Sequence, residues 1–230
     1  MNRKCLLVIA WLAVSAVIFA KDEVKNPNWL TADEIQAIVL QESPPPAPGS
    51  VEEQTDLQAE LDAQNTRTPE RIAEAKVDAH YSLDLFSNVI GFKITEASYP
   101  LTFRFFQDLL QQIDTVAVES KNHWRRPRPF RDHSEIHPLF ELASPSYPSG
   151  HSTSAFAYAV ILGRLFPDKF QAFLDRARQI AQSRVDAGVH YMSDIKEGEV
   201  VGKECAKELL AKPVFQAALN SAKTELTQRK

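Results

Sequence analysis

The sequence predicts an all-α fold, because helix start signals recur along the chain and no stretch alternates apolar and polar residues as a strand does. A chain of 230 residues can bury one large core, so we expect a single-domain helical bundle. Its 44% hydrophobic and 24% charged residues are ordinary for a globular protein. The formal net charge of −4 gives no overall basic field, which argues against nucleic acid as the main partner.

The N-terminus has the pattern of a secretory signal peptide. Two basic residues precede an uncharged run over 5–20, which ends in a small residue before a polar segment. The run is shorter than the about 20 apolar residues that a membrane-spanning helix needs. We therefore predict a signal peptide over residues 1–20, cleaved after Ala20 or Ala16, and a mature domain over 21–230. An uncleaved anchor is the alternative. We expect an exported protein without stable membrane insertion after signal removal.

The cysteine content excludes a disulfide within the mature chain. Of the two cysteines, Cys5 lies in the predicted signal peptide, so Cys205 stands alone and cannot form a cysteine-based metal site. Its helical, partly apolar surroundings predict that Cys205 is a core residue.

In the first half of the chain, capping signals mark the helix starts. Thr31 with Glu34 and Ser50 with Glu53 have the spacing of capping boxes, and Pro69 suits a first helical position. The predicted helices cover 32–41, 51–65, 69 to about 90, and 95–120. Their apolar stripes are Ile72, Val77, Tyr81, Leu85 and Phe86 in the third helix, and Phe105, Phe106, Leu109, Leu110, Ile113 and Val116 in the fourth.

The second half begins with a proline-rich stretch over 124–148, whose five prolines predict a long functional loop. A helix is expected from Ser149 through an apolar run to about residue 166. Further helices are predicted over 167–187, where Gly188 stops the helix, then over 191–210 and from 213 to about 226.

The turn Pro-Ser-Gly-His over 148–151 opens the most apolar helix. Backbone N–H groups at a helix start lack intrahelical partners and carry the positive end of the dipole, so an oxyanion binds well there. Ser149 adds a hydroxyl, Gly150 allows close approach of a ligand to the backbone, and His151 adds a titratable group. An ordinary helix cap is the alternative interpretation.

Two further polar clusters lie on either side of this turn in sequence. The first, over 121–129, contains Lys121 and Arg128, and a solvated basic loop or a patch for an acidic partner is its alternative interpretation. In the second, Arg184 precedes His190 and Asp194, which are four residues apart, the spacing at which helical side chains meet. A carboxylate on one imidazole nitrogen fixes the tautomer and leaves the other nitrogen free. A surface hydrogen bond is the alternative.

Taken together, the three clusters suit phosphoryl transfer through a phosphohistidine. Cations and backbone N–H groups hold the equatorial oxygens, one histidine attacks phosphorus, and the other protonates the leaving alkoxide. Lysine and arginine supply the positive charge, so we expect no metal and no other cofactor. The sequence has no HExxH motif, no aspartate-rich run and no P-loop.

The spacing Lys-x6-Arg-Pro, Pro-Ser-Gly-His and Ser-Arg-x5-His-x3-Asp resembles the three-part signature of the phosphatidic acid phosphatase type 2 superfamily. Lys121, Arg128, the turn over 148–151 and the segment 183–194 meet it. The Pro-rich segment over 44–48 and the Arg-Pro-Phe after the lysine further resemble bacterial class A non-specific acid phosphatases. This resemblance covers roughly residues 40 to 210 and implies an all-α bundle.

By that resemblance, His190 is the nucleophile, Asp194 orients it, and His151 is the general acid that later activates water. The resemblance also implies a periplasmic acid phosphatase acting on small-molecule phosphomonoesters. The residues that it assigns to phosphate binding are Lys121, Arg128, Ser149, Gly150 and Arg184.

Other functions remain as alternatives at this point. A vanadium-dependent haloperoxidase would hold vanadate in the same cage, and a lipid phosphatase would bring several membrane helices. A non-catalytic phosphate-binding protein would not require both His151 and His190. The sequence leaves open the physiological phosphoester, transfer to acceptor alcohols, and whether the protein is a homo-oligomer.

Overall fold

The computed structural model describes residues 28–228, and the predicted signal peptide lies outside the described residues. Over 28–228 the chain forms ten α-helices and two short 3-10 helices without any strand, so the predicted all-α bundle is confirmed. In chain order they are α1 Ala32–Gln41, α2 Val51–Thr66, α3 Pro69–Asp78, η1 Leu83–Phe86, α4 Ser87–Ile90, α5 Pro100–Trp124, α6 Pro129–Asp132, α7 Gly150–Leu165, η2 Pro167–Lys169, α8 Phe170–Asp186, α9 Met192–Leu210 and α10 Pro213–Gln228.

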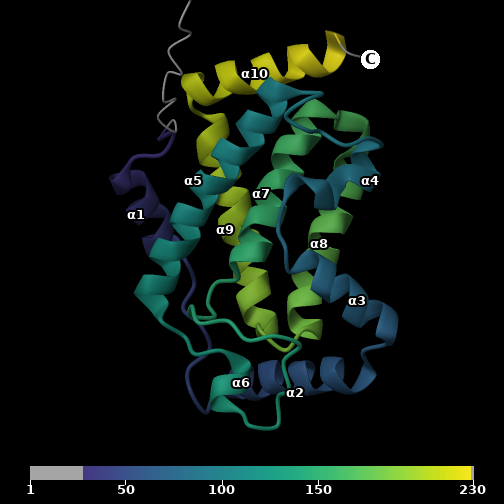
Figure 1. Ribbon diagram of the computed structural model, residues 1–230. Coiled ribbons are helices and arrows are strands. Elements are labelled where there is room, and N and C mark those ends of the chain that lie inside the picture. The colour runs from purple at the N-terminus through teal and green to yellow at the C-terminus, as the bar shows by residue number, and fades with distance from the viewer. Residues whose placement is uncertain (1–27, 229–230) are drawn as a thin grey trace, which may run out of the picture.

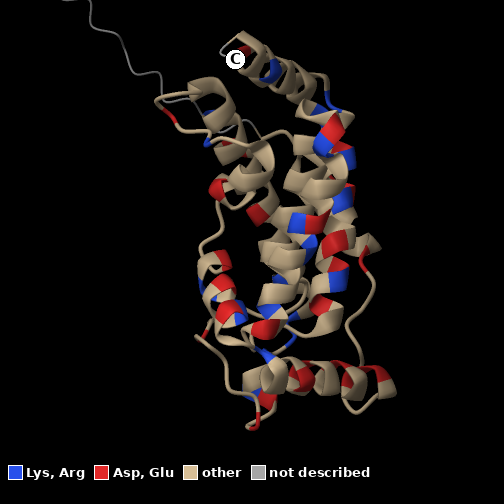
Figure 2. Cartoon of the chain, turned by 90° about the vertical axis from the view of Figure 1, so that its right-hand side faces the viewer, with Lys and Arg blue, Asp and Glu red and all other residues tan. Residues whose placement is uncertain are grey.

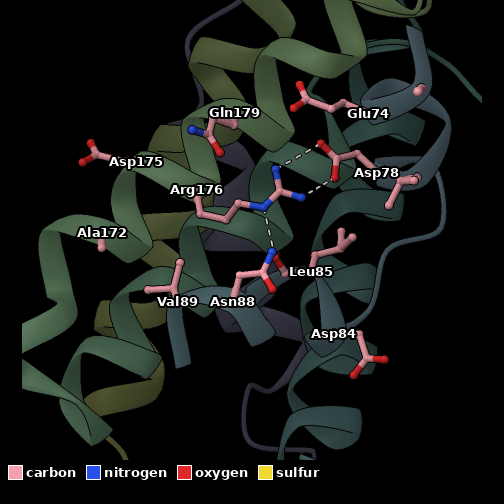
Figure 3. Close-up of a pocket in the computed structure, with 12 residues that line it drawn as sticks. Glu74, Asp78, Asp84, Leu85, Asn88, Val89, Ala172, Asp175, Arg176 and Gln179 are labelled. Carbon is pink, nitrogen blue, oxygen red and sulfur yellow. Dashed lines mark hydrogen bonds and ion pairs between the residues drawn. The ribbon is translucent and has the colours of Figure 1, made fainter. Parts of the chain in front are cut away.

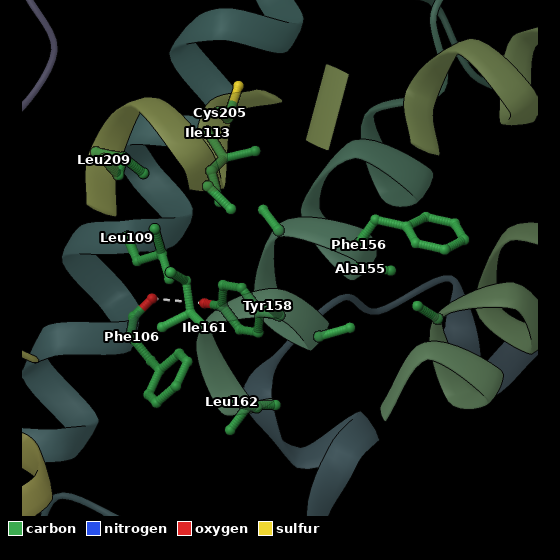
Figure 4. Packing of buried hydrophobic residues seen from close by; sticks show 14 of the residues in the cluster. Phe106, Leu109, Ile113, Ala155, Phe156, Tyr158, Ile161, Leu162, Cys205 and Leu209 are labelled. Carbon is green, nitrogen blue, oxygen red and sulfur yellow. Dashed lines mark hydrogen bonds between the residues drawn. The ribbon is translucent and has the colours of Figure 1, made fainter. Parts of the chain in front are cut away.

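Helix α7 is the centre of the bundle, with α5, α8 and α9 packed around it (Figure 1). Its sequence explains this position, because a helix that is apolar on all sides is stable only when it is surrounded. Of its 16 residues, 12 are buried, among them Phe156, Ile161 and Leu162. The one phenol in this helix, Tyr158, donates to the Phe106 carbonyl of α5 at 2.5 Å, so burial leaves its hydroxyl partnered (Figure 4).

Helix α9 approaches α7 closely because two glycines face it. A Cβ atom on Gly202 would lie 2.3 Å from the Thr153 carbonyl oxygen, and one on Gly198 would lie 2.7 Å from that of Ser149. The short distance lets Ser152 Oγ donate to the Ile195 carbonyl at 2.7 Å. The starts of α7 and α9 are thereby held side by side.

The functional clusters meet at one end of the bundle. There α7 and α9 begin, α5 and α8 end, and the loop between α5 and α7 folds across them (Figure 1). Helix α2 lies across this end and carries repeated acidic residues, while α10 covers the opposite end and packs on α5 and α9 (Figure 2). Two helix N-termini therefore point into the same region as the basic loop.

The prediction of one continuous helix over 69–90 is wrong, because the segment is divided into three shorter helical elements. α3 ends at Asp78, and the backbone is extended at Ser82 before η1 and α4 follow. The break is stabilised from α8, whose Arg176 donates to the Asp78 carboxylate at 2.5 Å and to the Leu85 carbonyl at 3.0 Å (Figure 3). Tertiary contacts, absent from any local pattern, thus override the helical periodicity of this segment.

Three smaller expectations also need correction. Val77, predicted in an apolar stripe, is 62% exposed, because the short α3 buries Ala75 and its terminal aspartate instead. The helix predicted over 95–120 begins at Pro100, which has no N–H to donate in a helix interior, and continues to Trp124. The loop over 124–148 also contains the short helix α6.

Two remaining observations concern the core and the membrane. Cys205 is fully buried in the main core, as predicted. Between residues 28 and 228, no helix combines the length and the apolar character that crossing a bilayer requires.

Candidate active site

His190 and Asp194 lie at the start of α9, both almost completely buried. Nδ1 of His190 is 3.2 Å from Oδ2 of Asp194, so the predicted pair is in contact. Nη1 of Arg128, which can only donate, is 2.9 Å from Nε2 of the imidazole. Nε2 is therefore the acceptor nitrogen, and the proton is on Nδ1, facing the carboxylate. The ring is held in the tautomer in which Nε2 is unprotonated and its electron pair accepts from Arg128.

Asp194 is itself held by two residues of the loop between α5 and α7 and by the backbone N–H at the N-cap of its own helix. Arg126 donates to its Oδ1 at 2.8 Å, and Oδ2 accepts from Ser146 Oγ at 2.5 Å and from the Tyr191 N–H at 2.9 Å. Arg126 also donates to Asp56 of α2 at 3.0 Å, which places this guanidinium between two carboxylates. Asp194 is thus fixed by charge and hydrogen bonds before any substrate binds.

Three cations surround the imidazole. Lys121, at the end of α5, donates to the carbonyls of Pro145 and Ser146 at 2.6 and 3.1 Å. Arg128 donates to the carbonyls of Ser144 and Val189 at 2.8 and 2.7 Å. These carbonyls position both cations while neutralising neither of them.

Arg184 is the third cation, and it differs from the other two. Its side chain is 1% exposed, and its Nε and Nη1 have no hydrogen-bond partner in the protein. The guanidinium carbon lies 5.1 Å from the centre of the Phe140 ring, which covers one face. A buried charged group with unused donors is costly unless a ligand pairs with it.

The turn of Ser149 and Gly150 begins α7 beside Lys121. Ser149 is the N-cap and accepts from the Ser152 N–H, while its own N–H donates to the Asp194 carbonyl at 3.0 Å. The first N–H groups of the helix after the cap have no intrahelical acceptor. A Cβ on Gly150 would make an ordinary van der Waals contact with Lys121 Cε at 3.9 Å, so the lysine side chain lies next to this helix start.

His151 lies in the first turn of α7, and its ring is bound to a backbone carbonyl. Its Nε2 is 3.1 Å from the Ala79 carbonyl oxygen, which can only accept, so Nε2 carries a proton and Nδ1 is the variable site. The ring packs edge-on against Tyr81, with 5.8 Å between centroids. Helix α3 ends just before Ala79, and the ion pair of Arg176 with Asp78 holds the end of α3 (Figure 3).

The electrostatics of the site disfavour further positive charge. Burial and then the nearby Arg128 and Lys121 hold the pKa of His190 well below its usual value. Burial and then Arg184 lower the pKa of His151 to about 3. Burial also lowers the pKa of Lys121 to about 7, with Arg128 as the next cause. An oxyanion bound among these groups would relieve this repulsion.

Asp194 is under opposing influences. Burial raises its pKa, while Arg126 and the Ser146 hydroxyl stabilise the ionised carboxylate and counter that rise.

A pocket of about 350 Å³ opens beside these groups and is lined by Lys121, Gly150 and His151. A larger hollow of about 620 Å³ lies between α3 and α8 around Asp78 and Arg176, but none of the predicted site residues lines it (Figure 3). The smaller pocket is the one that the chemistry can use. Among residues 28–228, no three histidine, cysteine, aspartate or glutamate side chains form a group that could hold a metal ion.

The residues named from the sequence come together from four helices and two loops. The residues that sequence reasoning missed lie around them: Arg126, Asp56 and Ser146 hold Asp194, and Ala79 holds His151. Arg126 belongs to the predicted basic cluster, and its position two residues before Arg128 is the one feature of the sequence that could have indicated a role in the site. Nothing local in α2 indicated Asp56.

Comparisons with known proteins identify the family of the chain. Residues 102–211 match the family model described as the PAP2 superfamily. Over 197 residues the chain is 32% identical to a non-specific acid phosphatase of Salmonella typhi, covering 80% of this chain and 79% of that protein. A non-specific acid phosphatase of Providencia stuartii is 28% identical over 202 residues, covering 81% and 79% of the two chains.

Solved structures share the fold. The transmembrane PAP2-type phosphatidylglycerolphosphate phosphatase of Bacillus subtilis aligns with a TM-score of 0.55 at 19% identity, over 76% of this chain and 90% of that one. A bacterial vanadium-dependent iodoperoxidase aligns at 0.53 and 20%, over 78% of this chain and 54% of that one. At these identities the alignments concern the fold alone. Sequence and fold together confirm the predicted family: the chain belongs to the PAP2 superfamily and, within it, to the non-specific acid phosphatases, which hydrolyse phosphoric monoesters.

Proposed function

We propose that this acid phosphatase works through a phosphohistidine on His190. The observation that carries the proposal is the position of Nε2, which is unprotonated, lies 2.9 Å from Arg128, and is oriented through Asp194 on the opposite nitrogen. Attack by Nε2 forms an N–P bond while the ester P–O bond breaks. The lowered pKa of His190 keeps the imidazole neutral, and hence nucleophilic, in acid.

The second histidine handles the protons in this scheme. The ester oxygen leaves as an alcohol after taking a proton from Nδ1 of His151, whose Nε2 remains bound to the Ala79 carbonyl. Neutral His151 then takes a proton from water, whose oxygen attacks phosphorus and breaks the N–P bond. Inorganic phosphate and free His190 result. Since His151 must be protonated first, we expect an acidic optimum, with the substrate's negative charge raising its pKa in the complex.

Positive charge from the chain itself replaces a metal in this proposal. Lys121, Arg128 and Arg184 would hold the equatorial oxygens together with the free N–H groups at the start of α7. The unused donors of Arg184 support this role, because phosphate oxygens would supply the acceptors that the protein lacks. Activity should therefore persist in EDTA.

We further propose export to the periplasm, on the basic start and the short uncharged run over 1–20. Cell fractionation with N-terminal sequencing of the mature protein tests this point. A mature chain that starts at residue 1 in the cytoplasmic fraction would contradict it.

The first experiment uses p-nitrophenyl phosphate, EDTA and vanadate. Hydrolysis should continue in EDTA and be inhibited competitively by vanadate and by inorganic phosphate, because the cage favours any tetrahedral or trigonal-bipyramidal oxyanion. If EDTA abolished activity and zinc or magnesium restored it, the prediction of a metal-independent enzyme would be wrong. Absent or purely uncompetitive inhibition by vanadate would argue against the proposed cage.

The second experiment separates the two histidines. Acid quench with labelled substrate should trap phosphate on His190, and His190→Ala should remove both the label and nearly all turnover. His151→Ala should slow an alkyl phosphate by about 10²–10⁴-fold but p-nitrophenyl phosphate much less, since a good leaving group needs little proton donation. Label on His151, or an equal loss for both substrates, would show that the roles are reversed or wrong.

A further inference from the structure

The pocket beside His151 has one feature that phosphate binding does not require. Its wall on α5 consists of Leu110, Asp114, Ala117 and Val118, which repeat at the spacing of one helix face. Three of these are apolar, and Asp114 is the one acidic residue that lines the pocket. The other wall is the Tyr81 ring. An alcohol leaving past His151 would lie between these walls.

Asp114 is placed to meet the far part of a leaving group. It precedes Lys121 by seven residues, or two helical turns, so it lies about 10 Å from the phosphate cage along the helix axis. Among residues 28–228 it has neither an ion pair nor a hydrogen bond, in contrast to the buried Asp56, Asp78 and Asp194. Its charge is therefore available to a ligand in the pocket.

A second unpartnered group faces the same carboxylate. The Tyr81 hydroxyl is buried and has no hydrogen-bond partner in the protein. Burial and then Tyr158 raise the pKa of the phenol, and Asp114 contributes after them; Tyr81 and Asp114 line the same pocket. Because this hydroxyl is inaccessible to a ligand, the unpaired carboxylate is the acidic group that a cation in the pocket can reach.

We propose that Asp114 is a specificity-determining residue, which favours phosphomonoesters of amino alcohols and disfavours esters whose alcohol carries an anion. The inference rests on the proposed phosphatase function, since it assigns the leaving group to this pocket. An ammonium group at the end of a short alkyl chain would bind the Asp114 carboxylate while its phosphate occupies the cage. A carboxylate at the same place would be repelled.

The test compares three esters of similar size: 4-aminobutyl, pentyl and 4-carboxybutyl phosphate. Their charged groups lie far from the ester oxygen, so the leaving alcohols have similar basicity. The assay is run at about pH 7, because desolvation in the pocket raises the pKa of Asp114 to about 6 even though its side chain is exposed at the mouth. The measured quantity is the ratio of kcat/KM for the amino ester to that for the carboxy ester.

We expect Asp114→Asn to lower this ratio by about three- to tenfold, the combined effect of two partly exposed charge interactions. Asp114→Lys should reverse the preference, and pentyl phosphate should change less than twofold in Asp114→Asn. Glu119→Gln is the matched control, because Glu119 is exposed on the same helix and does not line the pocket. In the wild-type protein, about 1 M salt should reduce the ratio toward one, since the Debye length falls to about 3 Å.

The possible outcomes distinguish the role of Asp114 from the phosphatase function on which it rests. An unchanged ratio in Asp114→Asn, with normal hydrolysis of pentyl and p-nitrophenyl phosphate, would overturn the role of Asp114 and leave the phosphatase function intact. A wild-type protein that hydrolyses none of these esters would overturn the proposed function instead. If a variant fails to fold, the salt dependence of the wild-type ratio decides, and a ratio independent of salt would contradict the inference.

Discussion

Arg126 and Arg184 are both buried in the candidate active site, yet their surroundings are opposite. Arg126 lies between two carboxylates, 2.8 Å from Asp194 and 3.0 Å from Asp56, with the Tyr191 ring against its guanidinium carbon at 3.9 Å. Arg184 faces no carboxylate at hydrogen-bond distance, and two of its nitrogens have no partner. The protein therefore pairs one buried guanidinium with carboxylates and leaves two nitrogens of the other without a partner.

The pKa values reflect the same difference. The carboxylates around Arg126 raise its pKa despite the opposing effect of burial, whereas burial and Arg128 lower that of Arg184 to about 10. Positive charge is thus stabilised at Arg126 and destabilised at Arg184 in the free protein. A satisfied buried charge fixes the position of its partners, while an unsatisfied one favours the binding of an anion.

The largest expected effect is on stability, in Arg126→Met. Removing the guanidinium leaves Asp56 and Asp194 buried without their cation, which should lower the free energy of unfolding by about 3–5 kcal/mol. For a chain of this size each kcal/mol shifts Tm by about 2–4 °C. Thermal unfolding measures the change, with Arg125→Met as the control because that neighbour is exposed. A Tm within a degree of the wild-type value would show that the ion pairs contribute little.

A somewhat smaller effect, this time on catalysis, is expected for Arg184→Met. Losing one preorganised donor to a transition-state oxyanion should reduce kcat/KM by about 10²–10³-fold. Tm should stay the same or rise, because a buried cation without hydrogen-bond partners is replaced by an apolar side chain of similar length. Arg178→Met, an exposed position on the same helix, is the control. A fall in Tm with kcat/KM retained would make Arg184 a structural residue and remove the contrast with Arg126.

The two arginines also differ in whether their roles could be predicted from the sequence. Arg184 was named because it belongs to a spaced pattern with His190 and Asp194, and such patterns are local or nearly so. Arg126 was not named, because its role depends on Asp56, which is 70 residues away and belongs to a different helix. No propensity or periodicity in α2 indicates which of its several acidic residues faces the active site.

The same reasoning explains the fold. Capping boxes and proline at first helical positions correctly predicted the starts of α1, α2 and α3. The break after Asp78 was missed, since it depends on Arg176 of α8 and on the packing of Tyr81 against His151. Local signals therefore predicted where helices begin. Contacts between residues distant in sequence determine where α3 ends and the segment that contacts His151 begins.

The smallest expected effect concerns anion binding and pH, and it tests whether an anion relieves the repulsion among the unpaired cations. Sulfate suits this test because it remains a dianion across the pH range used. In the free folded protein the pKa of His151 is lowered to about 3 from the 6.5 of an unperturbed histidine, and that of Lys121 is lowered to about 7. The folded protein therefore binds fewer protons than the unfolded chain over these ranges, so its stability without an anion falls as the pH falls.

A bound dianion raises both pKa values, and sulfate binding then takes up protons. By linkage, sulfate affinity must increase as the pH is lowered from about 8 to about 5, and the Tm increase at saturating sulfate must grow with it. A tenfold gain in affinity corresponds to about 1.4 kcal/mol, or a few degrees in Tm. His151→Ala should abolish the part of this gain below about pH 6.5, the unperturbed histidine pKa, and leave the part near pH 7 that belongs to Lys121. A sulfate shift that grows toward high pH, or one that His151→Ala leaves unchanged at low pH, would show that His151 does not gain its proton together with the bound anion.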